Sequence, residues 1–352
     1  MVTPELGKIN PRLMQSTVYQ NLGAFSHEVL VGPRFGVDNA VIRIGGGKVM
    51  IVTTDPLSLI PSLGPEDSAW MSVHLLASDV VTSGFPASYA LLDFNLPPHM
   101  GDSQFRAYWK SVHRECRNLG ISIIGGHTGR FQGCDYTVIG AGTLFAFGSE
   151  ERYLSSNMAR VGDSLLVTKG AAISASGILS RVFPQTVEKE YGKSFLRKAR
   201  DLFRRITTFE DGLTLASMGV RQEGVSAMHD TTEGGVLGAI YEMLLASNVG
   251  GKVQEDAIIL SDEAERICRL FSIDPFISLG EGALVAAVRS DRAEEAISLL
   301  SKHNIAASII GRIVERDEGI RVRKKSGEAP LRYPRVDPYW KAYWRAVQQG
   351  WK

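Results

Sequence analysis

The sequence has few cysteines and no long apolar run. Its 352 residues include three cysteines, Cys116, Cys134 and Cys268, with no CxxC pair, which excludes the usual zinc-site spacing and favours a reducing compartment. No uninterrupted apolar segment is long enough to span a membrane, and the first ten residues lack the basic and apolar regions of a secretory signal. We therefore expect a cytoplasmic protein with no membrane association.

An excess of one charge is also missing. The formal net charge is +1 at pH 7, whereas a general nucleic-acid-binding protein normally shows a strong basic excess. Positive charge gathers only near the end of the chain, where the residues from 320 onward include nine Lys or Arg and two Asp or Glu. We expect no nucleic-acid partner.

Two common nucleotide-binding signatures are absent. The chain has neither a G-x-x-x-x-G-K-[ST] loop nor a G-x-G-x-x-G segment that opens a helix. A P-loop or Rossmann protein is thereby disfavoured, and any nucleotide site must be built from other residues.

The most informative segment that is present reads MHDTTEGG and covers residues 228–235, just before an apolar helical pattern. It sets an imidazole, two carboxylates and two hydroxyls beside a glycine pair. Glycines let a backbone approach a ligand closely, a following helix offers unpaired N–H groups, and carboxylates hold the Mg²⁺ that accompanies a nucleotide. The segment indicates a phosphate and metal site, but Asp and Thr ahead of a helix are also ordinary caps.

Further candidates lie at the edges of expected elements. Asp38, Asp55 and Asp79 each stand near such an edge, and carboxylates converging from different loops suit Mg²⁺, a hard cation that prefers oxygen ligands. Taken singly, each is more simply a turn former or an exposed helix residue. The segment 125–128, GGHT, adds a flexible backbone and groups able to bind phosphate or move a proton, with a core histidine as the alternative.

A chain of this length usually divides into two domains. Strands and helices alternate in both halves, which favours α/β and α+β layers over an all-helical fold. The expected strands are 40–44, 48–54, 89–96, 121–124, a strand pair within 136–147, 283–288 and 307–313. The expected helices begin near 65 and 102 and cover about 236–246 and 291–303, and further helical segments are expected from about 194 to 219. We place the domains at 1–155 and 156–320, followed by a basic, aromatic tail at 321–352.

Taken in order, several segments resemble the family of aminoimidazole ribonucleotide (AIR) synthetase relatives, which includes HypE, thiamine-monophosphate kinase and selenophosphate synthetase. The resembling segments are 30–33, 36–41, 53–56, 78–80, 125–128, 162–170, 229–235, 280–284 and 310–313. They span roughly residues 8 to 315. The pattern looks closest to HypE and to archaeal AIR-synthetase-like proteins.

The resemblance implies a PurM-like two-domain fold. In this family the N-terminal α/β domain shares a β-barrel with its copy in a homodimer, a C-terminal α+β domain packs beside it, and ATP lies in a cleft between the domains. The Mg²⁺ ligands implied are Asp38, Asp55, Asp79 and Asp230. The other nucleotide contacts implied are Thr54, Gly126, His127, Thr128, Gly234 and Gly235. The catalytic residues implied are His229, Asp230 and Glu233.

The implied activity is ATP- and Mg²⁺-dependent: the enzyme phosphorylates, or activates by phosphorylation, a small-molecule or carbamoyl/amide acceptor. HypE proteins carry a cysteine at the end of their tail, whereas this chain ends QQGWK, so the HypE reaction on its own tail is not expected.

The tail supports an alternative of another class. Trp340, Tyr343, Trp344, Val347 and Trp351 recur at helical spacing. Such a stripe usually packs on its own domain or on a dimer mate. The alternative is a weakly catalytic or non-catalytic maturation or scaffolding factor that binds ATP and docks a protein partner through this helix.

Overall fold

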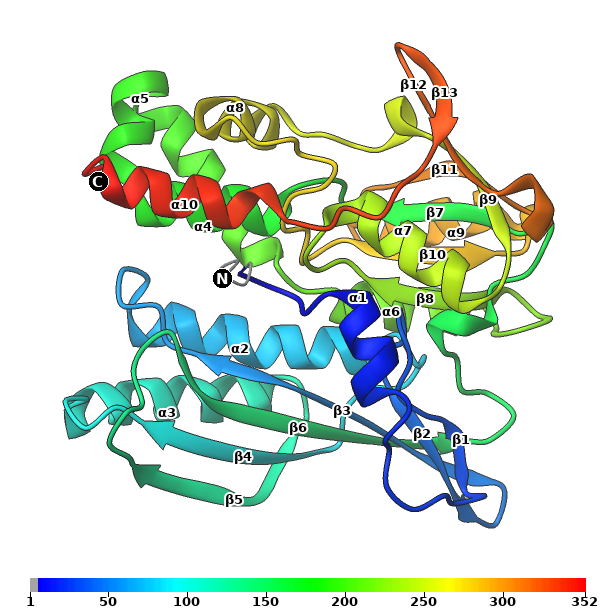
Figure 1. Cartoon of the computed structure of the whole chain (residues 1–352), viewed down its shortest axis with the longest axis horizontal. Coiled ribbons are helices and arrows are strands. Elements are labelled where there is room, and N and C mark those ends of the chain that lie inside the picture. The colour runs from blue at the N-terminus through cyan, green and yellow to red at the C-terminus, as the bar shows by residue number, and fades with distance from the viewer. Residues whose placement is uncertain (1–5) are drawn as a thin grey trace.

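The computed structural model describes residues 6–352, which form two open sheets with helices packed against them (Figure 1). The strands of the first sheet are β1 (Val29–Val31), β2 (Ala40–Gly45), β3 (Lys48–Ser58), β4 (Tyr89–Leu96), β5 (Ser122–Arg130) and β6 (Val138–Ser149). Side by side they follow the order β1-β2-β3-β6-β4-β5. β5 comes last in this order and is therefore an edge strand. Among the described strands of this sheet, only β4 and β5 pair in parallel.

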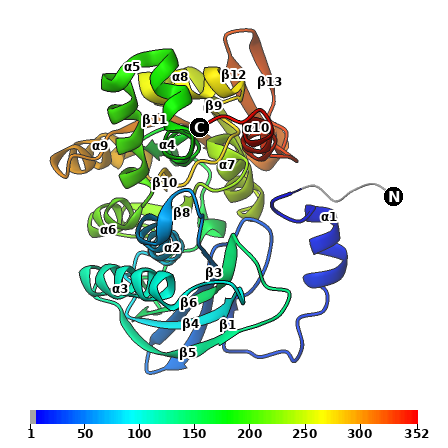
Figure 2. The same cartoon turned by 90° about the vertical axis from the view of Figure 1, so that its left-hand side faces the viewer.

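Helices cover one face of the first sheet only. They are α2 (Gly64–Val81) and α3 (Asp102–Asn118), which lie together on that face in Figure 2. Side chains alternate between the faces of a strand: in β3, Val49 and Ile51 are buried in the core, whereas Thr54 is exposed on the other side. The large apolar side chains exposed on the uncovered face include Ile44, Tyr89, Leu91 and Phe147.

The second sheet is larger. Its strands are β7 (Ser164–Thr168), β8 (Val225–Asp230), β9 (Gly250–Gln254), β10 (Leu284–Val288), β11 (Ala307–Val314), β12 (Ile320–Lys324) and β13 (Gly327–Pro330). They follow the order β13-β12-β9-β11-β7-β10-β8. Among the strands described for this sheet, β12 and β9 alone pair in parallel.

Helices cover the two faces of the second sheet unequally. One face packs against α4 (Ile173–Val182), α5 (Pro184–Asp201), α7 (Gly235–Ala246), α8 (Asp262–Phe271) and α10 (Pro338–Gln348). The other packs against α6 (Phe209–Ser217) and α9 (Ala293–Lys302), whose core partners lie mainly on β7, β8 and β10. Strands β8 and β10 are therefore buried along their whole length, whereas β9 and β12 keep one face uncovered.

The remaining helical segments are short. They are α1 (Pro11–Leu13), η1 (Met14–Val18), η2 (Ser156–Met158), η3 (Leu202–Arg205), η4 (Glu255–Ala257), η5 (Ser290–Arg292) and η6 (Arg316–Glu318). Asp67 of α2 forms ion pairs with Arg181 and Arg204, which join the two halves of the molecule. Across residues 6–352, we find no helix with the length and apolar character needed to cross a membrane.

Two expectations about elements change. The predicted strand pair within 136–147 is wrong: this stretch belongs to one long strand, β6, because both β3 and β4 pair with it. The short strand predicted over 121–124 is instead the longer β5, which continues through 125–128 to Arg130, whereas the helical segments expected from about 194 to 219 are confirmed as the end of α5, η3 and α6.

The C-terminal tail continues the second half of the molecule. β12 and β13 extend its sheet, and α10 buries Tyr339, Ala342 and Ala346 in its core. On the other side of α10, Trp344 and Val347 stay exposed.

Candidate active site

Aspartates from separate parts of the chain meet between the two sheets. Asp38 precedes β2, Asp55 lies in β3, Asp79 in α2, and Asp230 ends β8. The hydroxyl of Thr53 donates to Asp79 Oδ2 and to the Asp38 carbonyl, each at 3.1 Å. Strand alternation places Asp55 on the same side of β3 as Thr53, toward this cluster. The predicted metal ligands therefore lie together at the boundary of the two halves.

Crowding is visible in the ionisation of these carboxyls. Burial, followed by the charge of Asp38, raises the pKa of Asp230 to about 7. Burial raises the pKa of Asp55 to about 6. Burial together with the charges of Asp230, Asp55 and Asp38 holds the pKa of Asp79 well above its usual range. A bound cation would offset this repulsion.

Some of the carboxylate oxygens are left without partners. Asp38 Oδ2 and Asp230 Oδ1 are buried, and within residues 6–352 neither has a hydrogen-bond partner. Polar side-chain atoms of Asp38, Asp230 and His229 all lie within 4.8 Å of one another. Buried polar atoms are normally paired, and carboxylate oxygens are the ligands that Mg²⁺ prefers. The residues present therefore fit a magnesium ion.

His229 is clamped between two carboxylates. Its Nδ1 lies 2.6 Å from Asp38 Oδ1 and its Nε2 lies 2.9 Å from Glu242 Oε2. Tyr333 donates to the other oxygen of Glu242 at 2.8 Å. Burial alone lowers the pKa of His229, but the two carboxylates outweigh it and raise the pKa to about 10. For Glu242 the two effects have the opposite directions. Burial raises its pKa, but Lys8, His229 and Tyr333 outweigh burial and bring the pKa down to about 2.

The glycine pair makes a tight turn into α7. Gly234 and Gly235 have φ values of +85° and +62°, a left-handed region that glycine adopts without strain. A Cβ on Gly235 would lie 2.7 Å from the Phe276 carbonyl oxygen, so no side chain fits there. The Gly234 N–H is already engaged, since it donates to Asp337 Oδ2 at 2.9 Å.

Both ends of the described chain hold Glu233. Its carboxylate accepts hydrogen bonds from Trp340 Nε1 at 3.0 Å and from the backbone N–H of Lys8. The side chain of Lys8 reaches Glu242 at 3.3 Å. The cavity between this N-terminal segment and Gly234 measures only about 20 Å³, which is room for about one water molecule.

Two sets of predicted nucleotide contacts lie away from the aspartate cluster in the structure. Thr54 faces the uncovered side of the first sheet, where its hydroxyl donates to the Gly142 carbonyl at 3.0 Å. Gly126, His127 and Thr128 are exposed on the edge strand β5, separated from β3 by β6 and β4. Within one copy of the chain, these residues are not brought to the aspartate cluster.

Sequence reasoning missed several residues that contact the predicted site. Glu242 carries a usable signal, since a single carboxylate stands within the otherwise apolar run GVLGAIYEMLLA of α7 and buried charges require partners. Asp337 carries a weaker one, an N-cap aspartate before Pro338. Nothing in the local sequence connects Lys8 or Trp340 with Glu233, because these contacts join residues more than a hundred positions apart.

Comparison with known families matches both halves of the chain. The model of the AIR synthase related protein N-terminal domain matches residues 36–144. The corresponding C-terminal domain model matches residues 160–324. The first of these ranges contains Asp38, Asp55 and Asp79, and the second contains 228–235.

Curated relatives cover most of the chain at low identity. A Methanocaldococcus jannaschii protein assigned to hydrogenase expression or formation is 26% identical over 339 residues, covering 94% of this chain and 96% of its own length. Carbamoyl dehydratase HypE of Rhizobium leguminosarum bv. viciae is 24% identical over 292 residues, covering 81% of this chain and 79% of its own.

Solved structures share the fold. AaThiL complexed with AMPPCP and TMP superposes with a TM-score of 0.71 at 20% identity, covering 92% of this chain and 96% of that one. A HypE–HypF complex gives 0.70 at 19% identity, with 92% and 99% covered. The hydrogenase maturation protein HypE in complex with ATP gives 0.59 at 19% identity, with 92% and 95% covered. The architecture is thus the mixed two-domain PurM-like fold.

Proposed function

The chain belongs to the AIR synthase related protein family. We propose that it is an ATP- and Mg²⁺-dependent enzyme that phosphorylates an acceptor or activates the acceptor by phosphorylation. The observation that carries this proposal is the convergence of Asp38, Asp55, Asp79 and Asp230 with buried, unpaired oxygens. The complexes of AaThiL with AMPPCP and of HypE with ATP support the nucleotide. The acceptor we propose is a small molecule or a carbamoyl/amide group.

The aspartates would hold the metal. When bound, Mg²⁺ would neutralise phosphate charge and orient the transferred group. Asp38 and Asp230 offer the free oxygens for it, and Thr53 fixes the direction of Asp79. Since phosphoryl transfer depends mostly on positioning and charge neutralisation, such a site needs no covalent intermediate on the protein.

His229 acts in this proposal as a positioning residue. Both of its ring nitrogens face carboxylates, Asp38 and Glu242, so neither is free to touch a substrate. It holds Asp38 in the direction of Asp230 and keeps Glu242 buried. We assign the catalytic role to Glu233. Its carboxylate would be free to contact substrate at the surface of the loop once Lys8 and Trp340 no longer donate to it.

Nucleotide entry requires the N-terminal segment to move. The cavity of about 20 Å³ beneath Lys8 is far smaller than the several hundred Å³ typical of a ligand pocket. The segment is held chiefly by Lys8, through its N–H to Glu233 and its ammonium to Glu242. Both contacts can be exchanged for contacts with phosphate.

We also propose the shared barrel of a homodimer. The uncovered face of the first sheet exposes Ile44, Tyr89, Leu91 and Phe147, and contiguous apolar patches mark protein interfaces. A second copy packed on this face would bury them. The same arrangement would give 126–128 a route to a nucleotide held by the partner, because these residues border that face.

The test is calorimetric titration of ATP with MgCl₂ into the full chain. Asp230→Asn keeps the shape but removes a charged metal ligand, so we expect Mg²⁺-dependent affinity to fall about 100-fold. Asp317→Asn, which changes an exposed aspartate in η6, is the matched control and should bind as the unaltered chain does. Equal affinity in the two variants, or no Mg²⁺ dependence, contradicts the proposal.

The second candidate function is a maturation or scaffolding factor, favoured by the exposure of Trp344 and Val347 on α10. The HypE–HypF complex supports a protein partner. Turnover decides between the two. An enzyme releases ADP when thiamine monophosphate, formylglycinamidine ribonucleotide or another acceptor is supplied, whereas a scaffold binds ATP and releases no ADP with any of them.

A further inference from the structure

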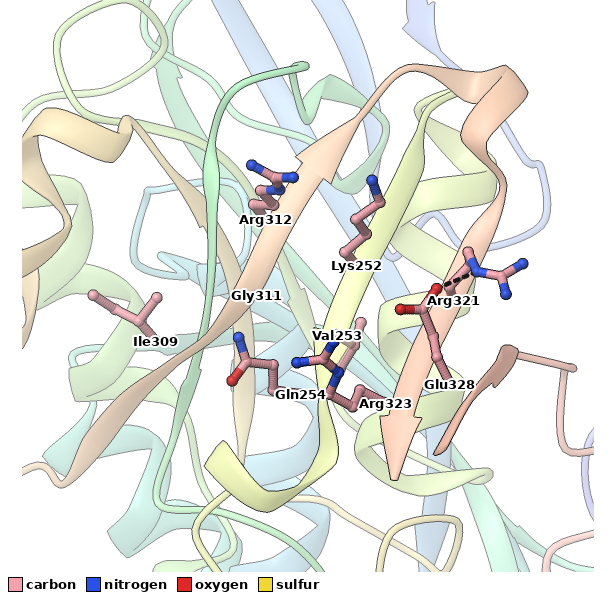
Figure 3. Close-up of a pocket in the computed structure, with 9 residues that line it drawn as sticks. All are labelled: Lys252, Val253, Gln254, Ile309, Gly311, Arg312, Arg321, Arg323 and Glu328. Atoms are coloured by element: carbon pink, nitrogen blue, oxygen red, sulfur yellow. Dashed lines mark hydrogen bonds and ion pairs between the residues drawn. The ribbon is translucent and has the colours of Figure 1, made fainter. Parts of the chain in front are cut away.

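A pocket lies on the uncovered part of the second sheet, away from the aspartate cluster. Its volume is about 420 Å³, within the range of small-molecule sites. Strands β9, β11 and β12 form its floor, and β13 contributes one wall (Figure 3). The charged residues that line it are Lys252, Arg312, Arg321, Arg323 and Glu328. Positive charge dominates this lining.

Three of the cations form a row across adjacent strands. In the strand register, Lys252 lies opposite Arg312 on one side and opposite Arg321 on the other. Residues directly opposite on neighbouring strands place their side chains on the same face, about 5 Å apart, and like charges in such positions destabilise a sheet. Figure 3 shows Lys252 and Arg312 on these neighbouring strands. Repulsion among these cations therefore destabilises the empty pocket, and a bound anion would relieve the repulsion.

The chain's own acids neutralise this charge only in part. Lys252 pairs with Glu318, and Arg321 pairs with Glu328. Within residues 6–352, Arg312 and Arg323 form no ion pair with a carboxylate. Two guanidinium groups thus remain available at the pocket, with Gln254 between the strands that carry them.

We propose that this pocket binds a small polyanion bearing at least two phosphate groups. The planar fork of an arginine matches phosphate oxygens in two parallel hydrogen bonds, and two free forks call for more than one such group. The bounded volume and the overall net charge of +1 favour a compact ligand over a nucleic acid, which would need an extended basic surface. The proposal is independent of the ATP site.

The experiment uses inorganic pyrophosphate as the probe. It is titrated into the full chain in EDTA-containing buffer, because without Mg²⁺ the acidic cluster repels the probe. We expect one pyrophosphate per chain, and about tenfold or greater loss of affinity in the double variant Arg312→Gln/Arg323→Gln. The matched control is Arg152→Gln/Lys302→Gln, which removes the same charge at exposed positions outside the pocket and should bind normally.

Three outcomes overturn the proposal. The first is an absence of pyrophosphate binding by the unaltered chain. The second is equal weakening in both double variants, which means that the probe senses only overall charge. The third is tighter binding of a 20-nucleotide single-stranded RNA than of pyrophosphate, together with a loss of RNA affinity in the pocket variant but not in the control variant. That result would assign the surface to nucleic acid.

Discussion

The two sheets of this protein each leave one surface uncovered, and the two surfaces differ in chemistry. The first exposes Ile44, Tyr89, Leu91 and Phe147, whereas the second gathers cations around Lys252. An apolar face is stabilised by burial against another apolar face, but a cationic face is stabilised by an anion. An uncovered sheet face therefore predicts a protein neighbour in the first domain and an anionic ligand in the second.

The largest expected effect comes from placing a charge on the apolar face of the first sheet. Leu91→Arg places a charge where a second copy would pack, and an unpaired buried charge costs several kcal/mol. We expect the dimer dissociation constant to rise about 100-fold or more, measured by analytical ultracentrifugation. Val161→Arg, at an exposed position outside the sheet, is the control. A Leu91→Arg variant that dimerises like the control would remove the distinction between the two faces.

A smaller effect concerns helix α2, which covers the first sheet, on the side of the helix that faces the second half of the molecule. His74 of α2 is buried, stacks on Trp70 with centroids 4.4 Å apart and contacts Thr207 at 3.0 Å. Burial lowers its pKa to about 4 from the usual 6.5. The unfolded chain therefore binds a proton between those values that the folded chain refuses, so His74 makes stability rise with pH from about 4 to 6.5 and adds no slope above.

His74→Gln removes this contribution. Urea unfolding at pH 4.5, 5.5 and 7 should show a shallower dependence in the variant, by about 1–3 kcal/mol across the window. His303→Gln changes an exposed histidine and should keep the original slope. If the His74 variant also keeps that slope, burial of the imidazole does not govern its protonation.

The smallest effect sharpens the cationic face. Removing one charge from the row relieves repulsion, so Arg312→Gln should raise the stability of the unliganded chain by a few tenths of a kcal/mol. Chemical denaturation measures this, with Arg152→Gln as a control expected to change nothing. A clear loss of stability would mean that Arg312 holds the sheet together, and the electrostatic contrast between the faces would weaken.

The sequence predicted much of the candidate site because its aspartates stand next to strand and helix edges. Asp38, Asp55 and Asp230 belong to segments whose order resembles a known family, and the packing of the two sheets brings Asp230 of β8 to the aspartates beside β2 and in β3. Thr54 shows the limit of that argument. It is adjacent to Asp55, but the period of two in a strand sends it to the opposite face.

Residues outside the motifs could not be placed from sequence. Tyr333 and Trp340 reach Glu242 and Glu233 only because the tail crosses α7 before α10 begins. That path depends on packing between distant segments, which no local pattern encodes.

The shared hold on Glu233 links events at opposite ends of the chain. Lys8 and Trp340 lie more than three hundred residues apart in sequence, yet both donate to this one carboxylate. A catalytic cycle that frees Glu233 would unfasten both segments in the same step. Limited proteolysis at the N-terminal and C-terminal segments should then accelerate together on nucleotide addition, so cleavage at either end reports when the loop opens.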